Sequence, residues 1–344
     1  MSEPVVEDPV EAPPARGPRL LRQTAAHLAG GAVSVFLVVV LGFFLFRVLP
    51  GDPARTMTRG APVSGAQLAE LRHRFGLDQP LWKQFTDYLG DMARGDLGTS
   101  YTYRRPVADL LAERFGPTVL LVGTATVLAV LLGLWLGTRA GWRRGGPIDR
   151  TATPVALALW SVPTFWLGLI ALMVLGVGVG PIPGLFPVSG ISSSDVPPGV
   201  LPRVLDVAHH LVLPVLTLVA VVHAQYLVVM RSSLLEEKGA EHLTTARAKG
   251  LREDLVRRRH AVPNALLPTV TLVFLHLGMV VGGAITVETV FTWPGLGLLT
   301  YEALRVPDLP LLQGTFLVLA VAVIAMNVLA ELVLRLLDPR VGAE

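Results

Sequence analysis

Six stretches of this chain contain no Asp, Glu, Lys or Arg, and each is long enough to cross a lipid bilayer. A spanning helix needs roughly 20 consecutive, mostly apolar residues. Charged residues make up only 16% of the chain, whereas a soluble domain carries about 25%. The sequence therefore predicts an all-α polytopic membrane protein with six transmembrane helices. The stretches lie between Arg22 and Arg47, Arg114 and Arg139, Arg150 and Asp195, Asp206 and Arg231, Arg259 and Glu288, and Asp308 and Glu331.

The third stretch is the longest and predicts the least regular span. Pro163 predicts a kink in it, because proline removes a helical hydrogen bond. The length also leaves room for a re-entrant or second segment, but residues 180–184 contain glycines and prolines that break the stretch. A second span there would also upset the alternation of basic loops downstream. The six predicted spans are residues 26–48, 118–138, 153–178, 209–230, 265–287 and 311–335.

Arginines indicate which ends of the spans face the cytoplasm. Four of them follow the second span closely, at positions 139, 143, 144 and 150. Short loops rich in Lys and Arg face the cytoplasm. Residues 1–25 are acidic and Pro-rich at first and basic later, so we expect a disordered cytoplasmic tail before a retained first helix. Six spans with both termini in the cytoplasm satisfy every basic cluster.

Residues 50–116 are predicted to form a helical cap outside the membrane. Their mixed charge is compatible with that position, since long loops cross the membrane largely regardless of charge. Residues typical of helix starts and ends divide the segment into three helices. These are the capping-box pair Ser64 and Gln67, the end signal Gly76, the start signal Pro80, the end signal Gly95, and the start signal Pro106 of a helix over 107–115.

A long basic loop, residues 232–264, joins the fourth and fifth spans. An ordinary cytoplasmic connector is the simplest interpretation, but two features argue for more. Gly250 permits a sharp turn, because glycine takes positive φ at no steric cost. Apolar residues also occupy positions on what should be a solvated helix. Two short helices that meet at this glycine would form a knob able to dock into a groove of another protein. The apolar positions are Leu243, Ala246, Leu251 and Leu255.

No catalytic or metal-binding pattern is recognisable in the sequence. There is no cysteine, no HExxH sequence and no Ser/His/Asp spacing, so we assign no catalytic residue, metal site or cofactor to this chain. The phosphate-binding pattern GxxxxGK[ST] is also missing, and no lysine follows a glycine. A small net charge of +3 argues against nucleic acid as a partner.

Several sequence blocks, in order along nearly the whole chain, resemble one family. TARAKG at 245–250 and HAVPNALLP at 260–268 resemble the EAA loop of binding-protein-dependent ABC importer permeases. With the other blocks, they resemble the B-type subunit of dipeptide/oligopeptide (Dpp/Opp-type) permeases, which implies a type I, MetI-like permease fold. The other blocks are PGDPA at 50–54, RFGLD at 74–78, GDLGTS at 95–100, SVPTFWLG at 161–168, VETVF at 287–291 and WPGLG at 293–297.

The resemblance implies that the loop couples this chain to an ATPase. In such importers the loop sits in a cleft on a cytoplasmic ATPase, and ATP binding closes two ATPases together and moves the permease from inward-open to outward-open. Thr244 stands where many importers have Glu, so a salt bridge from that Glu does not carry over. The residues implied in coupling are Thr245, Ala246, Arg247, Ala248, Lys249, Gly250, Leu251, His260, Pro263, Asn264 and Pro268.

The resemblance also implies a location and partners. Residues 117–340 would form the transmembrane permease domain, in the bilayer of a bacterial plasma (cytoplasmic) membrane. The partners would be a second homologous permease subunit, two ATP-binding-cassette ATPases that bind ATP and Mg, and an extracytoplasmic substrate-binding protein that delivers a peptide. Nickel, glutathione and other small solutes are alternative substrates, because their importers share this architecture.

Two other classes of function are weaker alternatives. An ion-coupled secondary transporter would carry acidic residues within its spans, and the six stretches lack them. A membrane-embedded enzyme would need a catalytic set, which is not recognisable.

A few residues of the fifth span are candidates for the pathway. Gly278, Gly282 and Gly283 form a small-xxx-small pattern, which favours helix packing over substrate contact. Glu288 lies at the outer end of the same span and is interpreted as a gate residue, a docking residue or an interface carboxylate.

Overall fold

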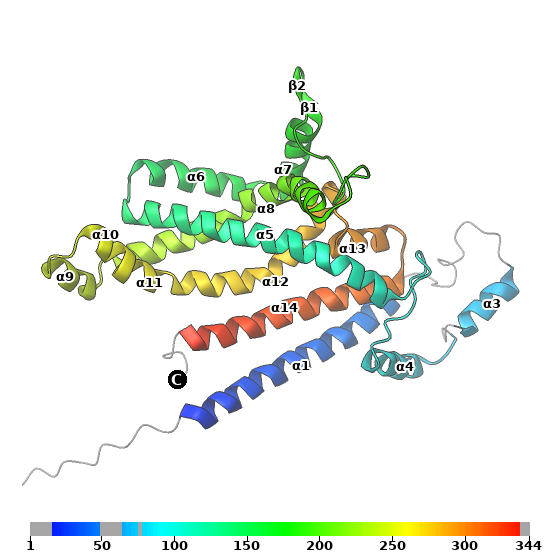
Figure 1. Cartoon of the computed structure of the whole chain (residues 1–344). Helices are drawn as coiled ribbons and strands as arrows, with labels where there is room; N and C mark the ends of the chain where they lie inside the picture. The colour runs from blue at the N-terminus through cyan, green and yellow to red at the C-terminus, as the bar shows by residue number, and fades with distance from the viewer. Residues whose placement is uncertain (1–15, 49–63, 75–77, 338–344) are drawn as a thin grey trace, which may run out of the picture.

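The computed structural model describes residues 16–48, 64–74 and 78–337, which are mostly helical (Figure 1). Long helices run side by side, and short helices gather at the two ends of the bundle. The elements are α1 Arg16–Val48, α3 Gly65–Arg74, α4 Leu81–Ala93, α5 Val107–Trp142, α6 Pro147–Ser161, α7 Thr164–Ala171, the π-helical turn η1 Leu172–Val177, β1 Gly178–Val179, β2 Ile182–Pro183, α8 Val200–Glu237, α9 Glu241–Ala248, α10 Glu253–Val256, the π-helical turn η2 Arg257–Ala261, α11 Val262–Ala265, α12 Leu267–Val290, α13 Leu296–Arg305 and α14 Leu309–Leu337.

The polytopic helical fold predicted from the sequence is confirmed. Within the described residues, four helices are long and apolar enough to cross a membrane, and one bent pair raises the number to five. The four are α1, α5, α8 and α14, and the pair is α6 with α7 and η1. Helix α12 lies over the predicted fifth span. Because the side chains of residues 275–283 are outside the description, it stays a prediction that α12 spans the membrane and that the spans number six.

Several helices extend past their predicted limits. Helix α1 begins at Arg16, so residues 16–25 are helical rather than part of a disordered tail, and residues 1–15 lie outside the described residues. Helix α5 continues through Pro117, which joins the predicted helix 107–115 and the second span into one helix. The predicted spans follow the charge-free stretches, whereas helical hydrogen bonding does not require lipid and continues beyond them.

The predicted third span is broken by a sharp bend next to Pro163, where a kink is predicted. Helices α6 and α7 meet at an angle of 102°. Val162 is extended there, with φ −82° and ψ 132°, because the residue before a proline is sterically disfavoured in the helical region. Helix α7 therefore leaves the bundle sideways and carries the β1–β2 hairpin at its far end (Figure 1).

Helices α5 and α8 form the closest pair in the bundle. Three glycines on α5, spaced four residues apart, face α8. A Cβ atom on Gly133 would lie 2.6 Å from the Cβ of Tyr226, and one on Gly137 would lie 2.6 Å from the carbonyl oxygen of Leu227. Gly141 is the third glycine of this row, and a Cβ on it would lie 2.9 Å from the carbonyl oxygen of Arg231. Small residues let helix backbones approach closely in membranes, and no side chain larger than hydrogen fits here.

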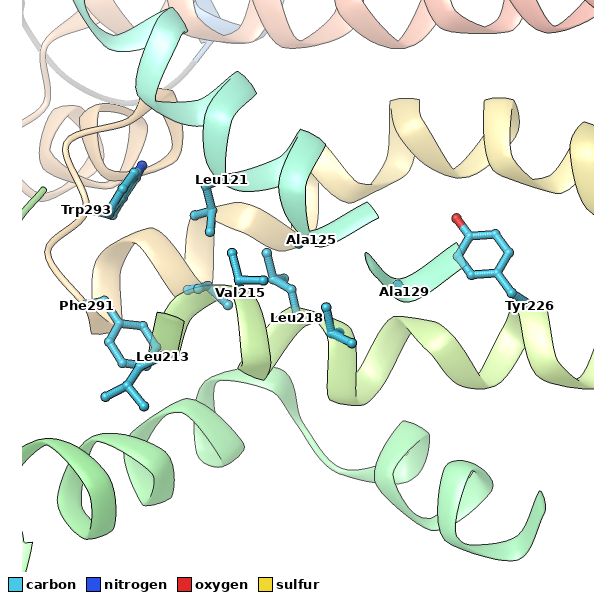
Figure 2. Packing of buried hydrophobic residues seen from close by; sticks show 11 residues of the cluster. Leu121, Ala125, Ala129, Leu213, Val215, Leu218, Tyr226, Phe291 and Trp293 are labelled. Carbon is cyan, nitrogen blue, oxygen red and sulfur yellow. The ribbon is translucent and has the colours of Figure 1, made fainter. Parts of the chain in front are cut away.

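Apolar side chains fill the rest of this interface. Figure 2 shows Leu121, Ala125 and Ala129 of α5 beside residues of α8, with Phe291 and Trp293 closing one end. All of these residues are almost completely buried. Since lipid is as apolar as these side chains, their close packing rather than the exclusion of water holds the pair together.

The predicted cap is only partly independent of the bundle. Ser64 and Gln67 form the expected capping box, with Ser64 N–H donating to Gln67 Oε1 at 3.0 Å and Gln67 N–H to Ser64 Oγ at 3.3 Å. Helix α4 ends before Gly95, whose φ is 77°, as predicted. Its Phe85 packs against Phe43 of α1, with ring centroids 5.2 Å apart. The predicted end signal Gly76 and the block at 50–54 lie outside the described residues.

The bundle has two distinct ends (Figure 1). Helices α9 and α10 lie at one end, together with the start of α1 and the end of α14. We call the segment from Glu241 to Val256 the knob and this end the knob end. Helices α3, α4 and α13 lie at the opposite end, which we call the cap end.

Candidate functional site

The knob consists of two short helices that meet at Gly250, as the sequence predicts. Helix α9 ends at Ala248, and Gly250 has a φ of 78°. Gly250 N–H donates to Arg247 O at 2.9 Å, and Leu251 N–H donates to Ala246 O at 3.3 Å. This pattern is a Schellman motif, in which a left-handed residue lets the last helical carbonyls find donors. An added Cβ on Gly250 would meet nothing within 4 Å, so backbone conformation rather than space requires glycine there.

An ion pair braces the two arms of the knob. Arg247 Nε on α9 lies 2.9 Å from Glu253 Oε1 on α10. Glu253 is exposed to water and Arg247 is about one-third exposed, so this pair contributes at most about 1 kcal/mol to stability. Its main effect is to limit how far the turn at Gly250 can open.

The inner face of the knob belongs to the protein's own core. Leu243 is fully buried and Ala246 is 5% exposed. Both pack against the end of α8 through Met230 and Leu234, and against Val256 of α10. The expectation that Leu243 and Ala246 lie on a solvated helix is therefore wrong for these two positions: they attach the knob to α8. Ala246 cannot present its side chain to an ATPase in this arrangement.

The outer face of the knob is open. Thr245, Ala248, Lys249 and Gly250 are exposed, and Leu251 is 37% exposed although it is apolar. These five predicted coupling residues form one continuous surface around the turn. Leu255 on α10 is 36% exposed. These six residues offer a partner one positive charge, one hydroxyl group, two small residues and two leucines, and Thr244 and Arg252 beside them are exposed as well.

The segment behind the knob ties it to the fifth predicted span. It runs through η2 and α11 into α12 and carries the other predicted coupling residues. Asn264 Nδ2 donates to Glu237 Oε1 at the end of α8, at 2.9 Å. His242 Nε2 of α9 lies 3.0 Å from the same oxygen. The Glu237 carboxylate at the end of α8 thus contacts side chains from both α9 and α11. Of the remaining residues, His260 is partly buried, whereas Pro263 and Pro268 are exposed near the starts of α11 and α12.

A second ion pair anchors the C-terminal part of α8 to the first turn of α6. Arg231 Nε lies 2.6 Å from Asp149 Oδ1, and Arg231 Nη2 lies 3.1 Å from Oδ2. Asp149 is 8% exposed and also accepts from Gly145 N–H at 2.8 Å. Bidentate Arg–carboxylate pairs fix geometry as well as supplying energy. Sequence reasoning missed this pair, although a single acidic residue among four arginines was a signal that it has a specific partner.

The cap end is organised around the buried side chain of Glu288. Thr118 Oγ1 of α5 donates to Glu288 Oε1 at 2.7 Å, and Leu298 N–H of α13 donates to Oε2 at 3.0 Å. Glu288 is fully buried, so in this structure it is neither an exposed gate nor a docking residue. It joins α5, α12 and α13. A Cβ on Gly297 would lie 2.6 Å from Ile285 Cα, which explains one glycine of the WPGLG block.

A second buried carboxylate holds the loop before α5. Asp308 is fully buried, and its Oδ2 accepts from Ser100 Oγ at 2.6 Å and from Thr102 N–H at 2.9 Å. Tyr103, in the same loop, donates from its hydroxyl to Glu302 Oε2 of α13 at 2.6 Å. Burial, reinforced by this hydrogen bond, raises the pKa of Tyr103 to about 12. The GDLGTS block thus docks onto the turn between α13 and α14.

The remaining predicted pathway residues are not brought to a defined site. Gly278, Gly282 and Gly283 lie in α12, in the stretch whose packing is outside the description. The close helix packing that the structure does show is between α5 and α8, along Gly133, Gly137 and Gly141. These glycines follow the same small-xxx-small spacing, so the sequence contained a signal for this contact. Among the described residues, no three His, Asp or Glu side chains are grouped so as to hold a metal ion.

Comparison with known protein families gives two matches that cover nearly the whole chain. Residues 129–343 match the family described as "Binding-protein-dependent transport system inner membrane component". Residues 20–122 match the N-terminal model described as "Binding-prot-dependent transport system membrane comp, N-term". The boundary between them falls inside α5.

Individual proteins of known name are also similar to this chain over nearly its whole length. The chain is 36% identical over 324 residues to the glutathione transport system permease protein GsiC of Escherichia coli O6:H1 (strain CFT073), covering 94% of this chain and 99% of that protein. The GsiC proteins of Escherichia coli strain K12 and Shigella flexneri serotype 5b match to the same extent. Among solved structures, the MetNI methionine ABC transporter aligns with a TM-score of 0.50 at 17% identity, covering 67% of this chain and 96% of that chain. That likeness supports the fold.

Proposed function

Because this chain belongs to the family of binding-protein-dependent transport system inner membrane components, we propose that it forms half of the substrate pathway of an ATP-driven importer. A second, homologous permease subunit supplies the other half. Two ATPase subunits on the cytoplasmic side bind ATP and Mg and drive the cycle, and an extracytoplasmic binding protein delivers the substrate. The start of α1 and the end of α14 then lie on the cytoplasmic side, because they share the knob end with the proposed ATPase contact, and we propose that both termini are cytoplasmic.

The knob is the observation that supports this proposal best. It presents an outward turn at Gly250 while its inner face is packed against α8 through Leu243. A force applied to such a turn passes directly into α8, and through Asn264 into the segment before α12. The knob can therefore move two long helices together, which is what coupling to an ATPase requires. The contact surface on this side is the exposed set from Thr245 to Leu251, without Ala246.

Replacing Gly250 with Val tests the proposed coupling. Valine at a φ of 78° is strained, because a β-branched residue strongly disfavours the left-handed region. We expect Gly250→Val to abolish substrate uptake and to separate it from ATP hydrolysis, while the protein still reaches the membrane. Gly95→Val is the matched control: Gly95 also follows a helix, has a φ of 77° and has open space around it. Normal uptake and normal substrate-stimulated ATPase activity in Gly250→Val would contradict the coupling role.

The proposed substrates are di- and oligopeptides, and glutathione is the strongest alternative. The glutathione hypothesis is supported by the similarity, over 94% of this chain, to permeases that are named for glutathione transport. Glutathione is itself a tripeptide with one unusual linkage, so the two hypotheses differ in how the binding protein recognises the backbone. Nickel or another small solute has less support.

Competitive uptake distinguishes these substrates. Cells that carry the complete transporter take up a radiolabelled dipeptide, and unlabelled tripeptide, glutathione or nickel is added in excess. Inhibition by peptides whose bonds are all ordinary α-peptide bonds supports the peptide hypothesis, whereas inhibition by glutathione alone, with its γ-glutamyl bond, supports the alternative. If the purified chain transported any of them without ATPase subunits and ATP, the importer hypothesis itself would fail.

A further inference from the structure

A basic cavity lies at the knob end, beside the bundle and separate from the outer face of the knob. It has a volume of about 280 Å³. Three arginines contribute to its lining, Arg139 and Arg143 at the end of α5 and Arg257 at the start of η2. Trp142 and the first residues of α6 complete it. The cavity therefore lies between the α5–α6 loop, beside the first turn of α6 that an ion pair fixes to α8, and the segment that leads from the knob into α12.

The charge in this cavity is largely uncompensated. Arg257 pairs with Asp254 at 2.5 Å. Arg139 stacks on the ring of Trp135, with Cζ 3.9 Å from the ring centroid, and in the described part of the chain neither it nor Arg143 forms an ion pair with a carboxylate. Asp149, next to the lining residue Ile148, is already engaged by Arg231. The cavity is thus lined by two guanidinium groups without a carboxylate partner, Arg139 and Arg143, and by that of Arg257, which pairs with Asp254.

The position along α5 places this charge at the surface of the bilayer. The apolar part of α5 ends at Arg139, and Trp135 and Trp142 flank that residue on either side. Tryptophan is enriched where the bilayer meets water, at the level of the lipid headgroups. Guanidinium groups bind phosphate oxygens in a planar, bidentate manner that lysine does not reproduce. Basic pockets between transmembrane helices at this level fit the headgroups of anionic lipids.

We propose that this cavity binds the phosphate group of an anionic phospholipid, with Arg139, Arg143 and Arg257 as its ligands. The lipid would connect the α5–α6 loop to the segment behind the knob, so that binding stabilises one position of that segment relative to α5. The site is independent of the substrate and of the ATPase contact proposed for the outer face of the knob.

Lipid retention measures this binding directly. The full-length chain is reconstituted in nanodiscs of phosphatidylcholine with or without phosphatidylglycerol of the same acyl chains, and native mass spectrometry counts the lipids that stay bound. We expect wild type to retain phosphatidylglycerol at least ten-fold more than phosphatidylcholine, and Arg143→Gln/Arg257→Gln to lose that preference. Arg144→Gln is the matched control, because Arg144 is the exposed neighbour of Arg143 and does not line the cavity.

Three further measurements separate lipid binding from misfolding and from binding of a soluble anion. Arg143→Lys keeps the charge, and we expect it to retain part of the preference, which shows that a loss in the double variant does not reflect misfolding. Equal melting temperatures of all variants in pure phosphatidylcholine confirm this. If inorganic phosphate raised the melting temperature of wild type in phosphatidylcholine while phosphatidylglycerol retention did not depend on the arginines, a soluble anion would be the ligand and the proposal would be overturned. Equal losses in Arg144→Gln and the double variant would overturn it as well.

Discussion

The two ends of the bundle are held together by different kinds of interaction. At the cap end, Glu288 and Asp308 are fully buried, and each accepts hydrogen bonds from other parts of the chain. At the knob end, Arg247 and Glu253 pair at the surface, and Asn264 reaches Glu237 at the surface too. Breaking a buried polar contact costs several times more than breaking an exposed one. The polar contacts at the cap end therefore resist rearrangement, whereas these exposed polar contacts of the knob end can be exchanged at low cost.

This difference between the two ends is compatible with the proposed function, in which an ATPase acts on the knob end. Asp149 is the exception at the knob end, because it is nearly buried and holds Arg231 with two hydrogen bonds. It anchors the C-terminal part of α8 to the first turn of α6, while the knob is attached to α8 by apolar packing. The helices can thus move as a unit when the knob is displaced.

The largest expected effect is at the cap end. Glu288→Ala removes the acceptor of Thr118 Oγ1 and Leu298 N–H and leaves both donors buried without it. We expect a loss of about 3 kcal/mol in the free energy of unfolding. Glu288→Gln keeps one carbonyl oxygen and should lose about half as much. Tryptophan fluorescence during denaturation in lipid nanodiscs measures both, with exposed Glu113→Ala as the control. Wild-type stability in Glu288→Ala would show that the cap end is not fixed by this carboxylate.

The next effect is at the C-terminal part of α8. Asp149→Asn weakens the pair with Arg231, and we expect a loss of about 2 kcal/mol, because one partner is nearly buried and the other is about one-quarter exposed. The double variant Asp149→Asn/Arg231→Gln should lose less than the sum of the two single losses, since each single change leaves the other partner unsatisfied. Strict additivity in the same unfolding assay would mean that the pair contributes no interaction of its own.

Local features of this structure could be predicted from the sequence. Long charge-free stretches predict where α1, α5, α8 and α14 lie, because the length of a span and the cost of charge in lipid are both local properties. The capping box at Ser64 and the left-handed glycine at position 250 are local as well, since each depends on residues within one helical turn.

Contacts between distant residues could not be predicted in this way. Thr118 and Glu288 are 170 positions apart, and Asp149 and Arg231 are 82 apart. Nothing in either neighbourhood identifies the partner. The same limit explains the error at Leu243, because an apolar residue on a short polar helix can face either another protein or the end of α8. Only the path of the chain in space decides between them.

A moderate and equal effect is expected from alanine at the two left-handed glycines. Gly250 and Gly95 have φ values of 78° and 77°, and both have open space around them. We expect Gly250→Ala and Gly95→Ala each to lose about 1 kcal/mol of stability, because only the backbone conformation is penalised. Uptake should fall in Gly250→Ala alone. Equal losses of uptake in both variants would show that the two ends do not differ in function.

The smallest effect is expected at the surface ion pairs, one at each end. Arg247 pairs with Glu253 across the turn at Gly250, and Arg94 pairs with Asp91 at 3.0 Å before Gly95. We expect Arg247→Ala and Arg94→Ala each to lose less than about 0.5 kcal/mol of stability, because water screens both pairs. The pair at Arg247 also joins two helices, whereas the pair at Arg94 lies within the end of one. If the knob transmits force, Arg247→Ala therefore lowers the amount of substrate taken up per ATP hydrolysed, whereas Arg94→Ala does not. Both variants are measured in the same vesicles, and their stabilities are expected to be equal. Equal coupling ratios in the two variants would mean that apolar packing through Leu243 alone holds the knob in its working position.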